Sequence, residues 1–447
     1  MSVAKDTIAA IATGPAAGGI GIIRLSGSES FNAATILSGR RPRVRRVELA
    51  RFTSADGSLI DQGLVLAFSA PHSFTGEDVV ELHAHGGLEV LDALLARVLS
   101  LGQVRLARPG EFSERAFLNN KIDLVQAEAI MDLIQAGSQQ AAKAATRSLA
   151  GEFSRKVNDL VERLIHIRVQ LEARIDFSDE ELSLHSIEVL NAQLVAWQQA
   201  LASLIAQTQT GVRLREGLRV VIAGAPNAGK SSLLNALLGA EAAIVSAEAG
   251  TTRDVIREQM VIDGVTLEIA DTAGIRAEAE AIEAEGIRRA KNAMAAADII
   301  LYVVDASDNN ALNTALNAIA TLTAEVILVL NKCDLYNPAA LPKEVASIAI
   351  SAKTGAGIDQ LKHTLRDRVR QSGDATSVFM ARRRHWQALE LARQYVAQAL
   401  SQSQQGAAIE LVAEELWQAQ NALAEITGRF ISDDLLGKIF GEFCIGK

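Results

Sequence analysis

The chain has 447 residues, of which 49% are hydrophobic, and its formal net charge at pH 7 is −9. This length leaves room for about two to four domains with buried cores, and the composition excludes a disordered chain. The acidic balance excludes a protein that holds nucleic acid through its overall charge, so any contact with RNA must be local.

The sequence also predicts where the protein resides. No run approaches the roughly eighteen uncharged apolar residues that cross a membrane, and no signal-peptide pattern follows Met1. The two cysteines, Cys333 and Cys444, are too few for a disulfide framework. We therefore expect a cytoplasmic protein with no membrane partner.

Two arginine clusters are the places where RNA could be held locally. Runs of charge are more often solvated surface, and this interpretation stays open for both clusters. They consist of Arg40, Arg41, Arg43, Arg45 and Arg46, and of Arg382, Arg383 and Arg384.

The N-terminal segment, residues 1–118, mixes strand and helix patterns. Short β-like runs occupy residues 20–25, 64–68 and 79–83, and a helical stretch covers residues 88–99. This mixture predicts a compact α+β domain.

Long helices are expected next, interrupted by an α/β region. Apolar residues recur at helical spacing within residues 119–215, as at Val157, Leu160, Leu164, Ile167 and Leu171. Residues 216–372 instead alternate buried strands with helices, which predicts a doubly wound α/β sheet. Helical periodicity returns in residues 373–447, so the α/β domain is expected to be inserted into an all-α domain of two segments. The expected strands cover residues 218–223, 267–270, 299–305, 326–330 and 348–351.

A phosphate-binding loop opens the α/β region. The strand at 218–223 leads into Gly224-Ala-Pro-Asn-Ala-Gly-Lys-Ser231 and then into a helix. In this arrangement backbone N–H groups surround phosphate oxygens, and the helix dipole adds to the attraction. Lys230 would reach the outer phosphates and Ser231 would ligate Mg²⁺. A mere glycine turn before a helix is the alternative interpretation.

Two further segments fit the phosphate side of a nucleotide site. Asp271-Thr272-Ala273-Gly274 follows a strand, where the carboxylate can hold the magnesium shell and the glycine N–H can sense the terminal phosphate. Between this segment and the loop lies Gly250-Thr251-Thr252, in which Thr252 is expected to complete the magnesium ligands. A capped turn is the alternative for Thr252.

The base side of the site follows the strands at 326–330 and 348–351. In Asn331-Lys332-Cys333-Asp334 the aspartate can accept two hydrogen bonds from guanine, which adenine does not offer in the same geometry. Ser351-Ala352-Lys353 offers backbone N–H groups to the guanine carbonyl. GTP is therefore the expected nucleotide.

One position departs from the Ras-like pattern. Ile275 stands where those enzymes carry the glutamine that orients the attacking water, and an isoleucine cannot do so. A polar substitute must come from the glutamates nearby. An amide oxygen of Asn227 is placed to hold a monovalent cation beside the phosphates. The candidate glutamates are Glu278, Glu280, Glu283 and Glu285.

Over essentially its full length the chain resembles the tRNA modification GTPase family MnmE, also called TrmE. The resemblance rests on motifs throughout the chain and on the C-terminal Phe443-Cys-Ile-Gly-Lys447. The other motifs are Gly18-Gly-Ile-Gly-Ile-Ile-Arg24-Leu-Ser-Gly27, Ser73-Phe-Thr-Gly-Glu-Asp78, Ala107-Arg-Pro-Gly-Glu-Phe-Ser-Glu-Arg-Ala-Phe-Leu118, the loop at 224–232, and Ala249-Gly-Thr-Thr-Arg-Asp254.

The resemblance implies a homodimer whose Ras-like GTPase domains pair in a potassium-dependent way. It also implies the flavoprotein partner MnmG, which carries FAD, in a heterotetramer. Together they place an aminomethyl-type group, carboxymethylaminomethyl, on carbon 5 of the wobble uridine of certain tRNAs. A tetrahydrofolate derivative, in the 5-formyl or methylene form, supplies the one-carbon unit.

The resemblance also implies roles for individual residues. Glu283 matches the family's water-orienting glutamate, and Asn227, Ser246, Glu248 and Thr251 match the K⁺ ligands. Folate contacts fall on Arg24, Glu81, Lys121 and Lys447 of an N-terminal folate-binding domain. The expected GTP-binding residues are Asn227, Ala228, Gly229, Lys230, Ser231, Ser232, Ser246, Ala247, Glu248, Ala249, Gly250, Thr251, Thr252, Asp271, Thr272, Ala273, Gly274, Asn331, Lys332, Asp334, Ser351, Ala352 and Lys353.

Several residues keep a plainer interpretation. Arg24 and Glu81 could be solvent-facing strand residues, and His83 with His85 is not predicted to bind metal because no further ligands accompany them. Cys444 is more simply a small buried side chain than a nucleophile. A regulatory GTPase that binds RNA or ribosome without modification chemistry is the alternative function.

Overall fold

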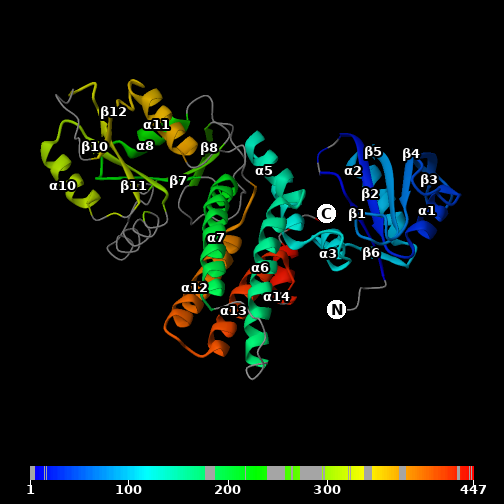
Figure 1. Cartoon of the computed structure of the whole chain (residues 1–447). Helices are drawn as coiled ribbons and strands as arrows, with labels where there is room; N and C mark the ends of the chain where they lie inside the picture. Colours follow the sequence, from blue (N-terminus) through cyan, green and yellow to red (C-terminus); the bar gives the residue numbers. More distant parts are fainter. Residues whose placement is uncertain are drawn as a thin grey trace, which may run out of the picture. The chain divides into compact units, whose positions relative to one another are not determined.

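The protein was analysed as a computed structural model of the whole chain, which forms two compact units. One unit comprises residues 1–131, 149–197 and 391–447, and the other comprises 132–148 and 198–390 (Figure 1). The structure describes residues 6–14, 16, 18–176, 187–216, 218–238, 257–262, 265–271, 294, 297–320, 322, 324–336, 345–371, 379–429, 433–441, 443 and 445–446, with 257–262 and 265–271 described by their backbone.

A six-stranded sheet forms the first part of the chain, in the order β3-β4-β5-β2-β1-β6. Its strands pair antiparallel except for β1 and β6, which are parallel. Helices α1 (Ser30–Ser38) and α2 (Leu88–Leu99) bury their apolar residues against one face (Figure 1). The strands are β1 (Thr7–Ile11), β2 (Gly18–Ser26), β3 (Glu48–Thr53), β4 (Leu59–Phe68), β5 (Val79–Gly86) and β6 (Val104–Leu106).

The predicted α+β fold of this segment is confirmed. The three expected strands fall within β2, β4 and β5, and the expected helix at 88–99 is α2. The short strands β1, β3 and β6 were not predicted. β1 and β6 have five and three residues, too few to show a period of two.

An ionic network joins α3 (Glu111–Leu118) to the start of β1. Glu111 is 1% exposed and accepts hydrogen bonds from Arg105 Nη1 at 2.8 Å and from Arg115 Nη2 at 3.0 Å. Arg115 also donates to Asp6 Oδ1 at 2.9 Å and to Glu77 Oε2 at 3.1 Å. Burial opposes ionisation of Glu111, but these arginine contacts and the Arg108 N–H outweigh it and lower its pKa to about 2.

Helices follow the first sheet, as predicted. The periodic apolar residues Val157, Leu160, Leu164, Ile167 and Leu171 are all buried. They lie on α6, which packs against α13, and Arg168 Nη1 donates to Gln420 Oε1 at 2.6 Å between these two helices. The helices are α4 (Leu124–Ile134), α5 (Gln139–Leu149), α6 (Glu152–Asp176), α7 (Ile187–Glu216), α12 (Arg383–Gln404), α13 (Ile409–Thr427) and α14 (Asp433–Gly441).

The end of the chain packs against its beginning within the first unit. Phe440 and Phe443 are buried, and their ring centroids lie 5.3 Å apart. Gly110, at φ 66°, lies so close to Phe440 and Phe443 that a side chain there would collide with them. Gly446, at φ 95°, lies equally close to the backbone of Ile11.

The second sheet has the order β12-β11-β10-β7-β9-β8 and is parallel except for the β8–β9 pair. Helices α8 and α11 contribute to a buried cluster with β7, β10, β11 and β12, whereas α10 packs with a second cluster. The predicted doubly wound fold is therefore confirmed. The elements are β7 (Leu218–Gly224), α8 (Lys230–Leu238), β8 (Arg257–Ile262), β9 (Val265–Asp271), β10 (Ile299–Asp305), α10 (Asn309–Ile319), β11 (Glu325–Asn331), β12 (Ala346–Ala349) and α11 (Ile358–Gln371).

A buried carboxylate holds both segments that flank this sheet in the sequence. Asp132 Oδ1 accepts from Arg215 Nε at 2.9 Å, just before β7, and from Arg382 Nη2 at 3.2 Å, just before α12. Gly211 packs against the backbone of Phe379 and Ala381, with no room for a side chain. The sheet is thus inserted between helices whose ends are joined. The predicted domain boundaries at residues 118, 215 and 372 stay a prediction.

Among the residues that the structure describes, no helix is both long and apolar enough to cross a membrane.

We predict that Glu111→Gln destabilises the first sheet by about 3 kcal/mol at pH 7, because the arginines lose their buried anion. The pKa of Glu111 is lowered from 4.5 to about 2 on folding. Its stabilising effect is therefore complete above pH 4.5 and disappears as the pH falls towards about 2. Hydrogen exchange of the β1 and α3 amides measures the free energy of opening in wild type and variant. The difference between these two free energies should shrink as the pH falls over that range.

Glu114→Gln is the matched control on the same helix, because Glu114 is partly exposed and its ionic partner among the described residues is the largely exposed Arg108. It should cost less than about 1 kcal/mol. Equal losses in the two variants would show that the buried network does not stabilise the fold.

Candidate functional site

The loop between β7 and α8 has the backbone of a phosphate cradle. Gly224 has a φ of 141°, Asn227 of 62° and Gly229 of 96°. A side chain at Gly224 would collide with the carbonyl oxygen of Val303 on the neighbouring strand β10. Glycine is therefore required at this position, and the loop turns tightly enough to present its N–H groups together with the first turn of α8.

Lys230 lies inside this loop as the first residue of α8. Its side chain is 6% exposed, and Nζ donates to the carbonyl oxygens of Gly224 at 2.9 Å and Ala225 at 2.8 Å. These contacts hold the ammonium group at the centre of the loop. A group placed there adds positive charge where a phosphate would lie.

Asn331 joins the phosphate loop to the loops after β11 and β12. Its side chain is 3% exposed, its Nδ2 donates to Ala228 O at 2.9 Å, and its Oδ1 accepts from Ala352 N at 3.0 Å. One buried amide thus fixes three loops at the carboxyl ends of the strands. The structure brings the predicted base-recognition residues next to the predicted phosphate loop.

Asp334 and Lys332 each have a polar partner. The partner of Asp334, Ser351, was among the predicted site residues, whereas the partner of Lys332, Asp305, was not. Ser351 Oγ donates to Asp334 Oδ1 at 2.6 Å, and Ser351 is fully buried. Lys332 Nζ lies 2.6 Å from Asp305 Oδ2, and this hydrogen bond is the main reason why the pKa of Asp305 is lowered. The sequence did not lead to Asp305 as the partner of Lys332, although a carboxylate at the end of the expected strand 299–305 pointed to the same edge of the sheet.

The remaining residues of the predicted nucleotide site are exposed or lie outside the described part. Ser231, Ser232 and Lys353 are exposed. Asp271 ends β9 opposite Ile222 of β7, which places its backbone beside the strand that leads into the loop. The residues outside the described part are Ser246, Ala247, Glu248, Ala249, Gly250, Thr251, Thr252, Thr272, Ala273, Gly274, Ile275 and Glu283.

Arg24 and Glu81 of the predicted folate site form a pair on neighbouring strands. Their register positions face each other on β2 and β5, and Arg24 Nε lies 2.9 Å from Glu81 Oε1. The Arg24 guanidinium carbon lies 5.8 Å from the ring centroids of both Phe74 and Phe112. The two aromatic residues were not predicted, although both lie in the quoted motifs.

Lys121 contacts the segment that carries Phe74. Its Nζ donates to Pro71 O at 2.9 Å, and its side-chain carbons lie beside Gly76. Lys121 therefore lies beside the segment that carries Phe74. Among the contacts that the structure describes, none joins Lys121 to Arg24. Lys447 and Cys444 lie outside the described residues.

His83 and His85 do not form a metal site in the described part of the chain, where no group of three or more metal-ligating side chains was found. His83 Nε2 lies 3.3 Å from Glu81 Oε2, and His85 Nδ1 lies 2.8 Å from Asp61 Oδ1. Burial of Asp61 opposes its ionisation. The hydrogen bonds that Asp61 accepts from the backbone N–H and the side chain of His85 outweigh this effect, so the pKa of the Asp61 carboxyl group is lowered.

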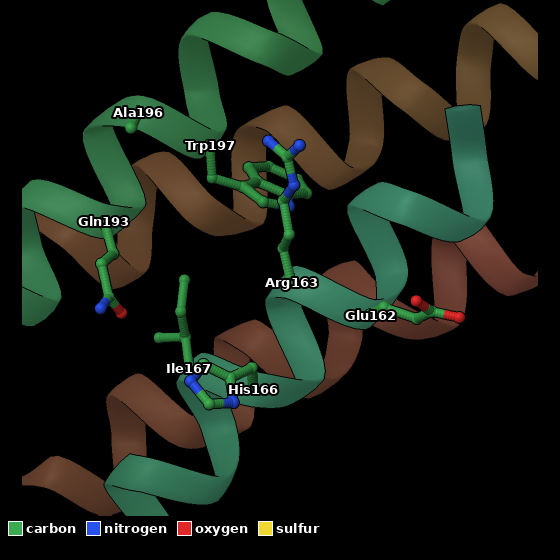
Figure 2. A pocket seen from close by; sticks show the side chains of 7 residues that line it. All are labelled: Glu162, Arg163, His166, Ile167, Gln193, Ala196 and Trp197. Carbon is green, nitrogen blue, oxygen red and sulfur yellow. The ribbon is translucent and has the colours of Figure 1, made fainter. Parts of the chain in front are cut away.

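A cavity of about 430 Å³ lies between α6 and α7, apart from the predicted sites. Figure 2 shows Trp197 and Ile167 at its apolar wall, with Arg163, His166 and Gln193 projecting around it. The Trp197 indole N–H donates to Leu160 O at 2.9 Å, so this ring is fixed by the helix packing. None of the described residues of the predicted nucleotide and folate sites lines the cavity.

Comparisons with known proteins cover the whole chain. The family model described as GTP-binding protein TrmE N-terminus matches residues 7–121, and the one described as MnmE helical domain matches residues 124–444. Among solved structures, the G domain of the T. maritima FeoB iron transporter is 21% identical and covers 35% of this chain and 99% of its own, with a TM-score of 0.26.

Two relatives match from end to end. The tRNA modification GTPase MnmE of Stutzerimonas stutzeri (strain A1501) is 51% identical in an alignment 456 residues long, gaps included, that covers 100% of each chain. The tRNA modification GTPase MnmE of Erwinia tasmaniensis (strain DSM 17950) is 51% identical in an alignment 451 residues long, gaps included, that covers 99% of each chain. With both family models and these relatives in agreement, the chain belongs to the tRNA modification GTPase family MnmE.

Proposed function

We propose that this chain hydrolyses GTP and, with a flavoprotein of the MnmG type, installs a carboxymethylaminomethyl group on carbon 5 of the wobble uridine of certain tRNAs. The observation that carries the nucleotide part is Asn331, whose buried amide joins the phosphate loop to the base-recognition loops. The relatives' name, tRNA modification GTPase, supports the rest. The predicted domain limits, residues 1–118, 119–215, 216–372 and 373–447, are part of the proposal.

In this proposal Asp334 accepts hydrogen bonds from the guanine base, with its carboxylate oriented by Ser351. The loop at 224–231 surrounds the phosphates, and Lys230 turns from its carbonyl partners to the phosphate oxygens. Ser231 and Thr252 ligate Mg²⁺. A hydroxyl at the first turn of α8 suits that role, because hard cations take oxygen ligands.

The proposed K⁺ site uses Asn227 together with Ser246, Glu248 and Thr251. Asn227 is exposed at the tip of the phosphate loop, in a left-handed conformation that turns the chain there. Its amide oxygen is a hard ligand of the type that K⁺ accepts. We propose that the cation offsets phosphate charge when two GTPase domains pair.

The proposed folate site is built around Arg24 and Glu81. Their pairing, with Phe74 and Phe112 near the guanidinium group, gives charged and aromatic groups that suit a flat heterocycle with N–H donors. Lys121 lies on the segment next to Phe74. Gly446, which precedes Lys447 in the sequence, packs against the backbone of Ile11 in this domain. The ligand is a tetrahydrofolate derivative in the 5-formyl or methylene form.

A homodimer is supported by the face of the first sheet that α1 and α2 do not cover. One row across that face consists of Leu49, Leu64, His83 and Ile22, which are adjacent by register. Leu49 is 59% exposed and Leu64 is 39% exposed. Three of these four side chains are apolar, and exposed apolar side chains close together favour burial against a second copy.

The alternative is a regulatory GTPase that binds RNA or ribosome without modifying it. Mass spectrometry of tRNA nucleosides from a strain that lacks this chain decides between the two functions. We expect the modified wobble uridines to disappear and to return when the wild-type chain is supplied. Unchanged wobble uridines in the deletion strain would exclude the modification function and leave the regulatory one.

We predict that Glu283→Ala lowers the rate of GTP hydrolysis by about 100-fold or more, whereas the affinity for GTP changes less than about threefold. The reason is that Ile275 cannot orient water, so a nearby glutamate must. The measurement is single-turnover hydrolysis in KCl together with equilibrium binding of GTP. Wild-type hydrolysis by the variant would contradict the role of Glu283.

Replacing KCl by NaCl in the same assay tests the cation proposal. Wild type should hydrolyse GTP at least about tenfold faster in KCl, because the larger ion fits the oxygen ligands around Asn227. Equal rates in both salts would remove the K⁺ role from Asn227 and leave that of Glu283 untouched.

A further inference from the structure

The segment from Arg40 to Arg51 is the most basic stretch of the chain. It contains six arginines and one glutamate, although the chain as a whole has a net charge of −9. We call residues 40–46 the arginine loop. The loop follows α1 and leads into β3, the edge strand of the first sheet.

The other arginine cluster is engaged in contacts within the protein. Arg382, with a side chain 12% exposed, pairs with the buried Asp132. Arg383 Nη2 lies 3.0 Å from Glu216 Oε2, and Arg384 is not free either. The two clusters therefore differ in the structure, because Arg382 is paired with Asp132 of α4 and Arg383 with Glu216 of α7.

The arginine loop has a defined backbone. Pro42 is buried, and Glu48 accepts hydrogen bonds from the backbone N–H of Arg43 at 3.1 Å and from its Nε at 2.7 Å. Arg45 donates its N–H to Ala67 O at 2.8 Å and has a φ of 56°, which is unfavourable for a residue other than glycine. These contacts hold the loop against β4 in one conformation.

The guanidinium groups project from this fixed backbone into solvent. Arg40 and Arg43 share Glu48 but remain 55% and 65% exposed. Arg45, Arg46 and Arg51 are exposed and have no acidic partner among the residues that the structure describes. A rigid loop with several unneutralised guanidinium groups matches phosphate groups, which arginine binds through two parallel hydrogen bonds.

We propose that the arginine loop together with Arg51 binds the phosphodiester backbone of the tRNA. This proposal rests on the proposed function, which makes tRNA the substrate. RNA is favoured over an acidic protein because contacts to phosphate need positive charge at a defined position rather than a complementary apolar surface. The acidic charge of the rest of the chain would then confine the tRNA to this edge of the first sheet.

The test compares two triple variants of the full chain. In the first, Arg45→Gln, Arg46→Gln and Arg51→Gln remove three charges from the proposed surface. In the control, Lys143→Gln, Arg163→Gln and Arg213→Gln remove three charges from exposed positions on α5, α6 and α7. The probe is a transcribed tRNA with uridine at the wobble position, and its Kd is measured from low to moderate salt.

We expect the first variant to weaken tRNA binding by roughly tenfold or more and to reduce the slope of log Kd against log salt by about two. The control should bind within about twofold of wild type. GTP hydrolysis without tRNA should be unchanged in both variants, and hydrogen exchange of the β1 and β4 amides should match wild type, which shows that both units fold. A further variant with lysine at positions 45, 46 and 51 should recover most of the affinity, because charge is retained.

Equal loss in the two triple variants would overturn the assignment, since binding would then follow net charge alone. Full tRNA affinity in the loop variant, or no binding by wild type, would also overturn it. If that variant kept tRNA affinity but lost tRNA modification, the loop would belong to a protein partner. The nucleoside analysis of the deletion strain tests the proposed function separately from all these outcomes.

Discussion

The proposed nucleotide site depends on one buried amide. Asn331 holds the carbonyl of Ala228 with its nitrogen and the N–H of Ala352 with its oxygen, so the loops after β7, β11 and β12 keep one relative position. A side chain with only donors or only acceptors would leave one of these buried groups unpaired, which costs stability. Asparagine meets both requirements in the space available beside Gly229, where even a methyl group would collide with it.

The parallel sheet explains why these groups meet. Strands β7, β10, β11 and β12 run in the same direction, so their carboxyl ends lie at one edge. Phosphate and base recognition are therefore built from segments far apart in the sequence. The first sheet uses a different arrangement, in which Arg24 and Glu81 face each other across two antiparallel strands. Each pairing follows from strand register rather than from proximity in the chain.

Much of this architecture could be predicted from the sequence because it is local. Buried apolar runs indicated β10 and β11 to within a residue, and helical periodicity identified the buried face of α6. The predicted last strand, residues 348–351, lies slightly late, since β12 ends at Ala349 and Ser351 already belongs to the site. Strand patterns do not reveal where pairing stops.

What the sequence could not provide was the choice of partners. The two arginine clusters look alike in the sequence, yet Asp132 neutralises Arg382 from a position 250 residues away. The pairing of Lys332 with Asp305 and the contact of Arg24 with Phe74 and Phe112 also join distant segments. Such contacts depend on the packing of whole elements, so composition and spacing alone do not specify them.

We propose that the loops joined by Asn331 form a site for guanine nucleotides. Equilibrium binding of GDP and ADP to the full chain in Mg²⁺ tests this site. We expect GDP to bind about 1,000-fold more tightly than ADP or better, because adenine would leave the Asp334 carboxylate without its donors. Similar affinities for GDP and ADP would show that these loops do not select guanine.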